Sequence, residues 1–116
     1  MIFASVANPI DLTADGSTEA YGKILDIVVK SDSVDAIITY ALPQTPKINV
    51  DIVETLKLAA MSKPVVAGAI GNRLSRVMLK ELEAARIPAF PSVNRTVGAM
   101  KVLCGYGEYL RRHRNE

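Results

Sequence analysis

The sequence predicts an α/β fold of three layers, in which a parallel sheet of four to five strands lies between layers of helices. Four short apolar runs, rich in β-branched residues, alternate with four longer stretches whose apolar residues recur every three or four positions. Repeated alternation of strands and helices is typical of a parallel sheet with helices on both faces. The length of 116 residues is that of one domain.

The four predicted strands cover residues 6–12, 36–42, 65–70 and 88–91. The second and third are almost continuously apolar, as expected of strands that are covered on both faces. Pro64 and Pro88 lie where the third and fourth strands begin, and a missing backbone N–H is tolerated at that position.

The four predicted helices cover residues 17–30, 49–61, 72–86 and 92–112. Each follows a residue that can cap a helix N-terminus: Ser17 or Thr18, Asn49, Asn72 and Ser92. In the last helix, Cys104 is expected to face inward together with Val93, Val97, Met100 and Leu103. The thiol of Cys104 is therefore interpreted as buried and structural.

The composition excludes several classes of protein and of site. A single cysteine rules out an internal disulfide and a multi-cysteine metal site. No apolar run is long enough to span a bilayer, and the N-terminus lacks the pattern of a secretory signal. We therefore expect a cytoplasmic protein without a membrane partner.

The charge is distributed unevenly along the chain. Residues 1–60 carry 8 acidic and 4 basic side chains (−4), and residues 61–116 carry 4 acidic and 10 basic ones (+6). Such a split can mark a nucleic-acid-binding face. With 5% aromatic residues and no Trp, the chain offers few side chains on which bases could stack, so no nucleic acid is expected as a partner.

The loops after the strands (residues 13–17, 43–48, 71–73 and 92–94) are expected at one edge of the sheet, where open α/β sheets bind ligands. Thr45, Lys47 and Asn49 precede a helix whose unpaired N–H groups attract an anion. Pro43 and Pro46 stiffen the loop of residues 43–48, and the alternative to an anion-binding role is that this loop is a rigid connector. The loop around Ser17 also precedes a helix and could bind an anion in the same way, and the alternative interpretation is a helix cap and a turn. The sequence contains no glycine-rich phosphate-binding motif.

No catalytic group can be assembled from the remaining polar residues. His113 is the only histidine and lies in a charged stretch near the end of the sequence, without an orienting partner nearby in sequence. No catalytic residue and no metal site is predicted.

Several phrases resemble a known family. The stretch Asn8-Pro9-Ile10-Asp11-Leu12-Thr13 is similar to the Asn-Pro-Val-Asp-Leu-Thr opening of one domain in the nucleoside-diphosphate-forming acyl-CoA synthetases. That superfamily includes ADP-forming acetate–CoA ligase and succinyl-CoA synthetase. The resemblance continues in order through residues 34–38, 42–45, 63–67 and 87–92, and then Val97, Ala99 and Tyr106. The Pro43-Gln44-Thr45-Pro46 segment is closer to the acetate-type branch than to the succinyl branch, which has a Gly-Gly pair there.

The resemblance implies a ligase-CoA domain, a flavodoxin-like module of larger chains or subunits. The family joins a carboxylic acid to CoA at the expense of ATP, through an acyl phosphate and a phosphohistidine. One helix N-terminus of the module faces the phosphohistidine loop, and the corresponding residues here are Pro43, Gln44, Thr45, Lys47, Asn49 and Val50. Secondary anion-facing positions are Asn8, Asp11, Thr13, Ser17, Thr18, Gly71 and Asn72.

By the same resemblance, residues 1–116 form a single succinyl-CoA synthetase-like domain, a fragment or separated module of a larger acid–thiol ligase. CoA, ATP/ADP and Mg²⁺ would be bound by the complete enzyme and not by this domain alone. Its partners would be the CoA-binding, phosphohistidine-bearing and ATP-grasp domains or subunits, and a homo-oligomer is left open. We expect the isolated chain to be inactive. The alternative is a stand-alone, non-catalytic binding or scaffolding module.

Overall fold

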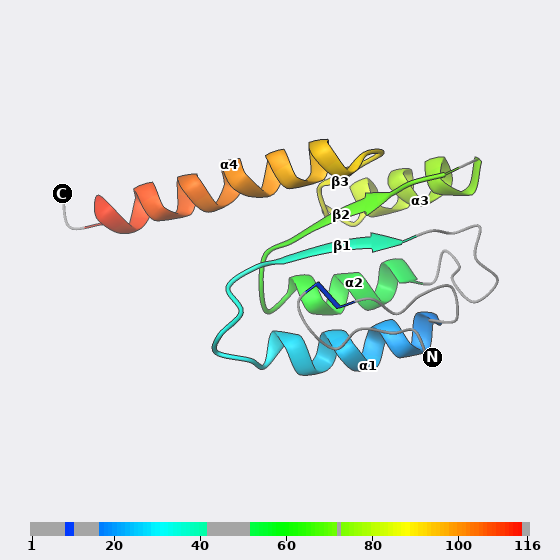
Figure 1. Ribbon diagram of the computed structural model, residues 1–116, viewed down its shortest axis with the longest axis horizontal. Helices are drawn as coiled ribbons and strands as arrows, with labels where there is room; N and C mark the ends of the chain where they lie inside the picture. The colour runs from blue at the N-terminus through cyan, green and yellow to red at the C-terminus, as the bar shows by residue number, and fades with distance from the viewer. Residues whose placement is uncertain (1–8, 11–16, 42–51, 72, 115–116) are drawn as a thin grey trace.

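Helices and strands alternate along the chain in the computed structural model, which describes residues 9–10, 17–41, 52–71 and 73–114 (Figure 1). The described helices are α1 (Thr18–Val29), α2 (Ile52–Ala60), α3 (Arg73–Ala84) and α4 (Val93–Arg112). The described strands are β1 (Ile37–Ala41), β2 (Val65–Ala69) and β3 (Ala89–Phe90). This order confirms the predicted alternation over these ranges.

The strands form a parallel sheet in the order β1-β2-β3. Ile37 pairs with Val65 at one end of the β1–β2 ladder, and Ala67 pairs with Ala89 in β3. The predicted parallel arrangement is therefore confirmed for these three strands. Of the strand predicted at residues 6–12, only Pro9 and Ile10 are described, and neither is in a strand; the rest lies outside the described residues.

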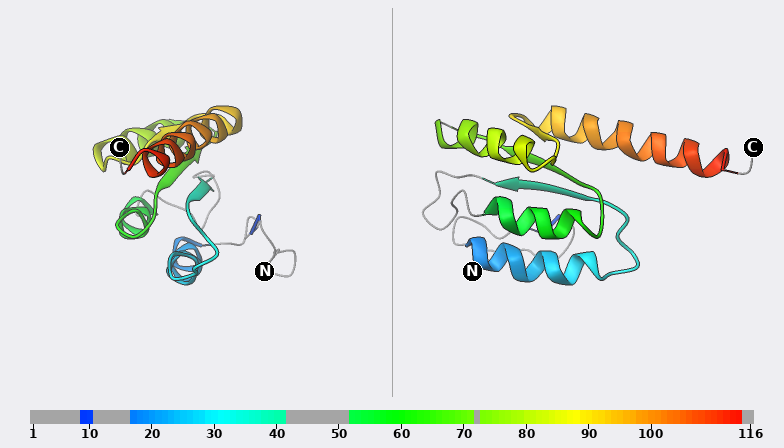
Figure 2. Two further views of the ribbon diagram at one scale, coloured as in Figure 1. Left: turned by 90° about the vertical axis from the view of Figure 1, so that its left-hand side faces the viewer. Right: turned by 180° about the vertical axis from the view of Figure 1, so that it is seen from behind.

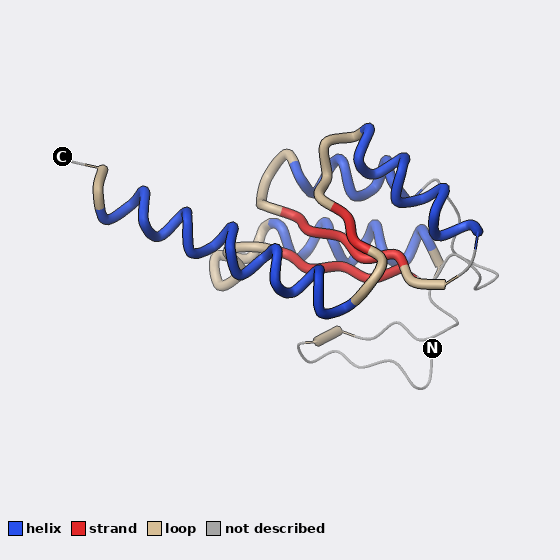
Figure 3. Tube along the Cα trace, turned by 90° about the horizontal axis from the view of Figure 1, so that it is seen from above, coloured by secondary structure: helices blue, strands red, loops and turns tan. Residues whose placement is uncertain are grey.

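The two faces of the sheet are covered differently. Helices α2 and α3 lie on one face, with α1 packed beside α2, whereas α4 lies on the other face (Figures 2 and 3). Val65 and Ala67 of β2 belong to the main hydrophobic core, together with Ile52, Leu56, Met78 and Leu82 of α2 and α3. Val66 points to the opposite face and is also buried. The arrangement is the α/β/α layering expected of a flavodoxin-like domain.

Helix α3 ends in a turn that uses a left-handed residue. Arg86 has a φ angle of 64°. The N–H of Ile87 donates to the carbonyl of Leu82, and the N–H of Arg86 donates to that of Glu83, both at 2.9 Å. These two bonds are those of a Schellman motif, and they direct the buried side chain of Ile87 into the core.

Lys63 joins two connections at the amino edge of the sheet. Its ammonium group donates hydrogen bonds to the backbone carbonyls of Ser31 and Val34, in the segment between α1 and β1. Lys63 itself lies between α2 and β2. The side chain therefore fixes the entry to β1 against the entry to β2.

Helix α4 extends well beyond the sheet (Figure 1), and the domain measures 51 × 28 × 23 Å. Thr96 and Met100 are buried in its first half, whereas every residue from 101 to 114 is exposed. The expectation that Val93, Val97, Leu103 and Cys104 face inward is wrong. In the first half of α4 it is Thr96 and Met100 that are buried, while Val93 and Val97 are exposed; Leu103 and Cys104 are exposed in the half that extends beyond the sheet. No helix in the described ranges is long and apolar enough to cross a bilayer.

Candidate functional site

The candidate site is the edge of the sheet at which the parallel strands end. Because β1, β2 and β3 run in one direction, their carboxyl ends meet there, and the helices that follow them begin there (Figure 1). The first turn of α1 lies at the same edge (Figure 1). Helix N-termini carry unpaired N–H groups and a partial positive charge, so this edge has the electrostatic character of an anion-binding face.

Tyr40, near the end of β1, connects the elements of this edge. Its backbone carbonyl accepts a hydrogen bond of 2.5 Å from the hydroxyl of Tyr21 on α1. Its own hydroxyl donates to the carbonyl of Val93, in the first turn of α4, at 3.3 Å. The ring lies next to Gly68 of β2, where an added Cβ would approach within 2.5 Å of Cδ1. Tyr40 thus sets the positions of α1, β2 and α4 relative to one another.

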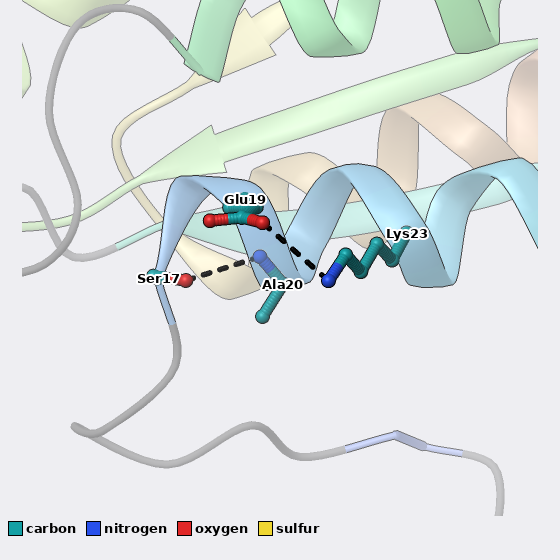
Figure 4. A network of polar contacts seen from close by, with 4 residues as sticks. All are labelled: Ser17, Glu19, Ala20 and Lys23. Carbon is teal, nitrogen blue, oxygen red and sulfur yellow. Dashed lines mark hydrogen bonds and ion pairs between the residues drawn. The ribbon is translucent and has the colours of Figure 1, made fainter.

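Ser17 caps α1 (Figure 4). Its side-chain oxygen accepts a hydrogen bond of 3.1 Å from the backbone N–H of Ala20, and Glu19 forms an ion pair with Lys23 at 3.4 Å on the same turn. The predicted cap at Ser17 is confirmed. Since this oxygen already satisfies one of the first N–H groups, and Glu19 places a carboxylate in the first turn, this helix start is less suited to an anion than the sequence implies.

Thr18 differs from Ser17. Its hydroxyl oxygen is buried and has no hydrogen-bond partner in the described part of the chain. A buried hydroxyl without a partner retains its capacity to donate and to accept. Of the two predicted positions at the start of α1, Thr18 is therefore the one whose hydroxyl is still available to donate or accept a hydrogen bond.

Gly71 lies two residues after the end of β2, with a φ angle of 139°. This conformation is in the range that strongly favours glycine, so the residue sets the direction in which the chain leaves the sheet. Arg73 begins α3, whose first turn contains no acidic residue. A basic residue with no acidic neighbour in that turn keeps this part of the edge positive.

The start of α4 has the same character: its loop, residues 92–94, was expected at this edge, but none of its residues was named as an anion-facing position. Ser92 caps the helix by accepting a hydrogen bond of 3.2 Å from the backbone N–H of Arg95. The buried hydroxyl of Thr96 donates to the carbonyl of Ser92 at 2.7 Å. The first turn contains no acidic residue, and Arg95 is exposed. Sequence reasoning missed Arg95, although its position three residues after the expected cap was the available signal.

Tyr21 and Tyr40 were also missed as organisers of the edge. Both occupy positions that fit the apolar pattern of a helix and a strand, and neither was predicted from the sequence as a site residue. Their hydroxyl groups were the available signal, because a partly buried Tyr normally finds a hydrogen-bond partner.

Most of the predicted site residues lie outside the described residues. This holds for the loop-facing set Pro43, Gln44, Thr45, Lys47, Asn49 and Val50, and for Asn8, Asp11, Thr13 and Asn72. Of the secondary set, the structure describes Ser17, Thr18 and Gly71. Within the described ranges, no group of three or more His, Cys, Asp or Glu side chains could hold a metal ion.

Comparison with solved structures identifies a relative of this domain. The chain superimposes on a dinucleotide-forming acetyl-coenzyme A synthetase 1 from Ca. Korarchaeum cryptofilum with a TM-score of 0.78 and 32% sequence identity, over 91% of this chain. The resemblance to the acyl-CoA synthetases is confirmed. The same enzyme in complex with phosphate and ADP gives the same values. No protein-family model and no curated protein sequence matches the chain.

The chain spans 24% of the length of these synthetase structures. It therefore matches one segment of the synthetase polypeptide. An identity of 32% together with this TM-score indicates a similar arrangement of the backbone over nearly the whole domain.

Proposed function

We propose that this chain is a domain of an acid–thiol ligase that forms acyl-CoA and ADP from a carboxylic acid, CoA and ATP. The observation that carries the proposal is the match to the acetyl-CoA synthetase over 91% of the chain at 32% identity. One solved form of that synthetase is a complex with phosphate and ADP. A nucleotide-dependent synthetase therefore contains a segment folded like this domain.

Within that enzyme, the domain would receive the loop that carries the phosphohistidine at the carboxyl edge of its sheet. The convergence of helix starts at this edge supports the proposal, as do Arg73 and Arg95 in first turns without acidic residues. A phosphorylated side chain near a helix start is stabilised by the unpaired N–H groups and by the helix dipole. The domain would supply this electrostatic stabilisation and no catalytic side chain.

The remaining components of the reaction belong to the rest of the enzyme in this proposal. CoA, ATP/ADP and Mg²⁺ would be held by the CoA-binding, phosphohistidine-bearing and ATP-grasp domains or subunits, in a cytoplasmic enzyme. The isolated chain would then form no thioester from acetate or succinate, CoA, ATP and Mg²⁺. Turnover by the isolated chain that survives His113→Ala would contradict this division of roles.

A chimera tests the proposal directly. The matching segment of the Korarchaeum synthetase is replaced by this chain, and histidine phosphorylation, acetyl-CoA formation and ADP binding are measured. A synthetase from which the segment has been deleted is the control. We expect the chimera to be phosphorylated and active, and the deletion variant to be inactive.

ADP binding distinguishes a wrong proposal from a damaged protein. A chimera that binds ADP like the parent enzyme but is not phosphorylated would overturn the role at the phosphohistidine loop. In that case the non-catalytic binding or scaffolding module would be the better description of this chain.

A further inference from the structure

The exposed second half of α4 carries a stripe of apolar side chains that the domain does not cover. Val102 is 72% exposed and Tyr106 60%, and the stripe continues through Leu103, Tyr109 and Leu110. Leu103, Tyr106 and Tyr109 are three positions apart, Val102 and Leu110 are each four positions from Tyr106, and all five therefore lie on one side of the helix. Lys101, Cys104 and Glu108 lie on the opposite side by the same period. This stripe is called the α4 stripe below.

A groove continues the α4 stripe onto the sheet. It has a volume of about 430 Å³ and is lined by Val66, Pro88, Ala99, Val102, Leu103 and Tyr106. Beside it, Ile38 of β1 pairs with Val66 and is 38% exposed on the face that α4 covers only partly. The α4 stripe, the groove and Ile38 thus form an apolar surface that follows the helix axis.

Two glycines in the exposed half of α4 give a reason to expect that a partner binds to this part of the helix. Gly105 and Gly107 lie in the exposed half, and a Cβ at either position would meet nothing within 4 Å, so packing within the described residues does not require glycine there. Each glycine weakens a helix by about 1 kcal/mol relative to alanine. A solvated helix end with two such residues is marginal, and contact with a second surface would stabilise it.

Charge identifies the chemistry of the occupant. The exposed end of α4 carries Lys101, Arg111 and Arg112, with Arg114 directly after the helix, and Glu108 is its one acidic residue. Two α4 helices packed in parallel through their stripes would bring two ends of net positive charge close together, which argues against such a symmetric pair. The groove argues against a flat lipid surface, since a convex side chain fills it better.

We propose that the α4 stripe and its groove bind an amphipathic helix of a partner domain or subunit whose surface outside its apolar face is acidic. Such a helix would lie along α4 and place one large apolar side chain in the groove between Val66 and Tyr106, while its carboxylates would be attracted by the net positive charge of the exposed end of α4. By the helical period Arg111 lies on the side of Cys104, whereas Arg112 lies three residues after Tyr109 and therefore next to the stripe, so Arg112 is the arginine best placed to meet a carboxylate of the partner. The inference is independent of the reaction proposed above, because it depends only on this surface.

The test uses a synthetic helical peptide of about five turns, with leucines and a single Trp on one face and glutamates elsewhere. The chain contains no Trp, so the peptide fluorescence reports binding without background. We expect saturable binding on the order of 10–100 µM, accompanied by a blue shift of the Trp emission. A matched peptide with lysines in place of glutamates should bind about tenfold more weakly or not at all.

Variants of α4 locate the binding surface. Tyr106→Asp and Leu110→Asp should each weaken binding of the acidic peptide by about tenfold or more, because a carboxylate enters the apolar stripe. Cys104→Asp places the same charge on the opposite side of the helix and should change the affinity less than about twofold. Tyr106→Ser removes the apolar group without adding charge, and circular dichroism confirms that each variant is folded.

The proposal is wrong if the acidic peptide does not bind, or if the acidic and the lysine peptides bind equally well. It is also wrong if Cys104→Asp weakens binding as much as Tyr106→Asp does. A dimer of the full chain that Tyr106→Asp dissociates would show that the occupant is a second copy of the chain. Binding to anionic phospholipid vesicles or to single-stranded RNA that is stronger than peptide binding, and that is lost in Tyr106→Asp, would assign the surface to a membrane or to nucleic acid instead.

Discussion

Gly68 lies against the ring of Tyr40 so closely that a larger residue fits only if neighbouring side chains move. A Cβ added to Gly68 would lie 2.5 Å from Cδ1 and 2.7 Å from Cε1 of the ring, and 2.9 Å from Oγ1 of Thr96. The close approach lets the Tyr40 hydroxyl reach the carbonyl of Val93 and lets the first turn of α4 lie on β2. One glycine in the central strand thus sets the distance between the sheet and α4.

Gly68→Ala should lower the free energy of unfolding by about 1–3 kcal/mol, because the added methyl group forces Tyr40 and Thr96 to move. Urea unfolding followed by circular dichroism measures the change. Gly98→Ala is the matched control: nothing lies within 4 Å of its added Cβ, so alanine should stabilise α4 by up to about 1 kcal/mol. In a Tyr40→Ala background the cost of Gly68→Ala should fall, and an unchanged cost would show that the ring is not the obstacle.

Tyr21→Phe should destabilise the chain by about 0.5–1.5 kcal/mol. The substitution keeps the ring and removes the hydrogen bond to the carbonyl of Tyr40, which ties α1 to the end of β1. Tyr106→Phe removes a hydroxyl from a side chain that is 60% exposed and should change stability by less than about 0.5 kcal/mol. Equal thermal unfolding of the two variants would mean that the Tyr21 hydroxyl does not hold α1 in place.

Lys63→Met should cost about 1–2 kcal/mol, since two hydrogen bonds from an ammonium group to the carbonyls of Ser31 and Val34 are lost. Lys23→Met provides the comparison, because Lys23 takes part in an ion pair with Glu19 in which both side chains are at least 75% exposed. Loss of such a pair should cost less than about 0.5 kcal/mol. Chemical denaturation of both variants checks the difference, and a Lys63→Met variant as stable as Lys23→Met contradicts it.

Arg86→Gly should stabilise the chain by about 0.5–1 kcal/mol. Arg86 has a φ angle of 64°, a conformation that a side chain disfavours and glycine adopts freely. Arg76→Gly, an exposed position inside α3, should change stability in the opposite direction by about 1 kcal/mol. Melting temperatures that move in the same direction for both variants would show that the backbone at residue 86 is not strained.

Free phosphate should bind weakly at the carboxyl edge. Because a single helix start contributes only about 0.3–1 kcal/mol toward an anion, we expect a Kd in the millimolar range or weaker. The largest amide NMR shifts on addition of phosphate should occur in residues 45–50, with smaller ones in residues 13–18 and 72–74, and sodium chloride at equal ionic strength is the control. Shifts confined to residues 111–114 would assign the anion preference to the basic end of the chain.

Strand–helix alternation in the sequence was sufficient to predict the order of the described elements and the parallel pairing of β1, β2 and β3. The apolar runs that include Ile37 and Val65 became neighbouring strands, and Ser17 and Ser92 cap their helices as expected. Short-range patterns succeed here because periodicity and capping depend on residues within a few positions of one another.

The inward face of α4 was predicted less well. The spacing of apolar residues in α4 identifies an apolar side of the helix. It does not tell whether the sheet extends far enough to cover that side, and Leu103 and Cys104 were therefore wrongly placed in the core. At the candidate site, a hydrogen bond such as that from Tyr21 to Tyr40 joins residues that are 19 positions apart, and its partners are determined only by the folded geometry. The role of Lys47 and its neighbours stays a prediction.

The short strand β3 has a consequence for the solubility of the chain. Its two residues, Ala89 and Phe90, lie between Pro88 and Pro91, and neither proline has a backbone N–H to offer to an approaching strand. Long, regular edge strands recruit strands from other molecules and begin aggregation, whereas short edges interrupted by proline resist this pairing. The same prolines that confine β3 to two residues therefore protect this side of the sheet from cross-molecular strand addition.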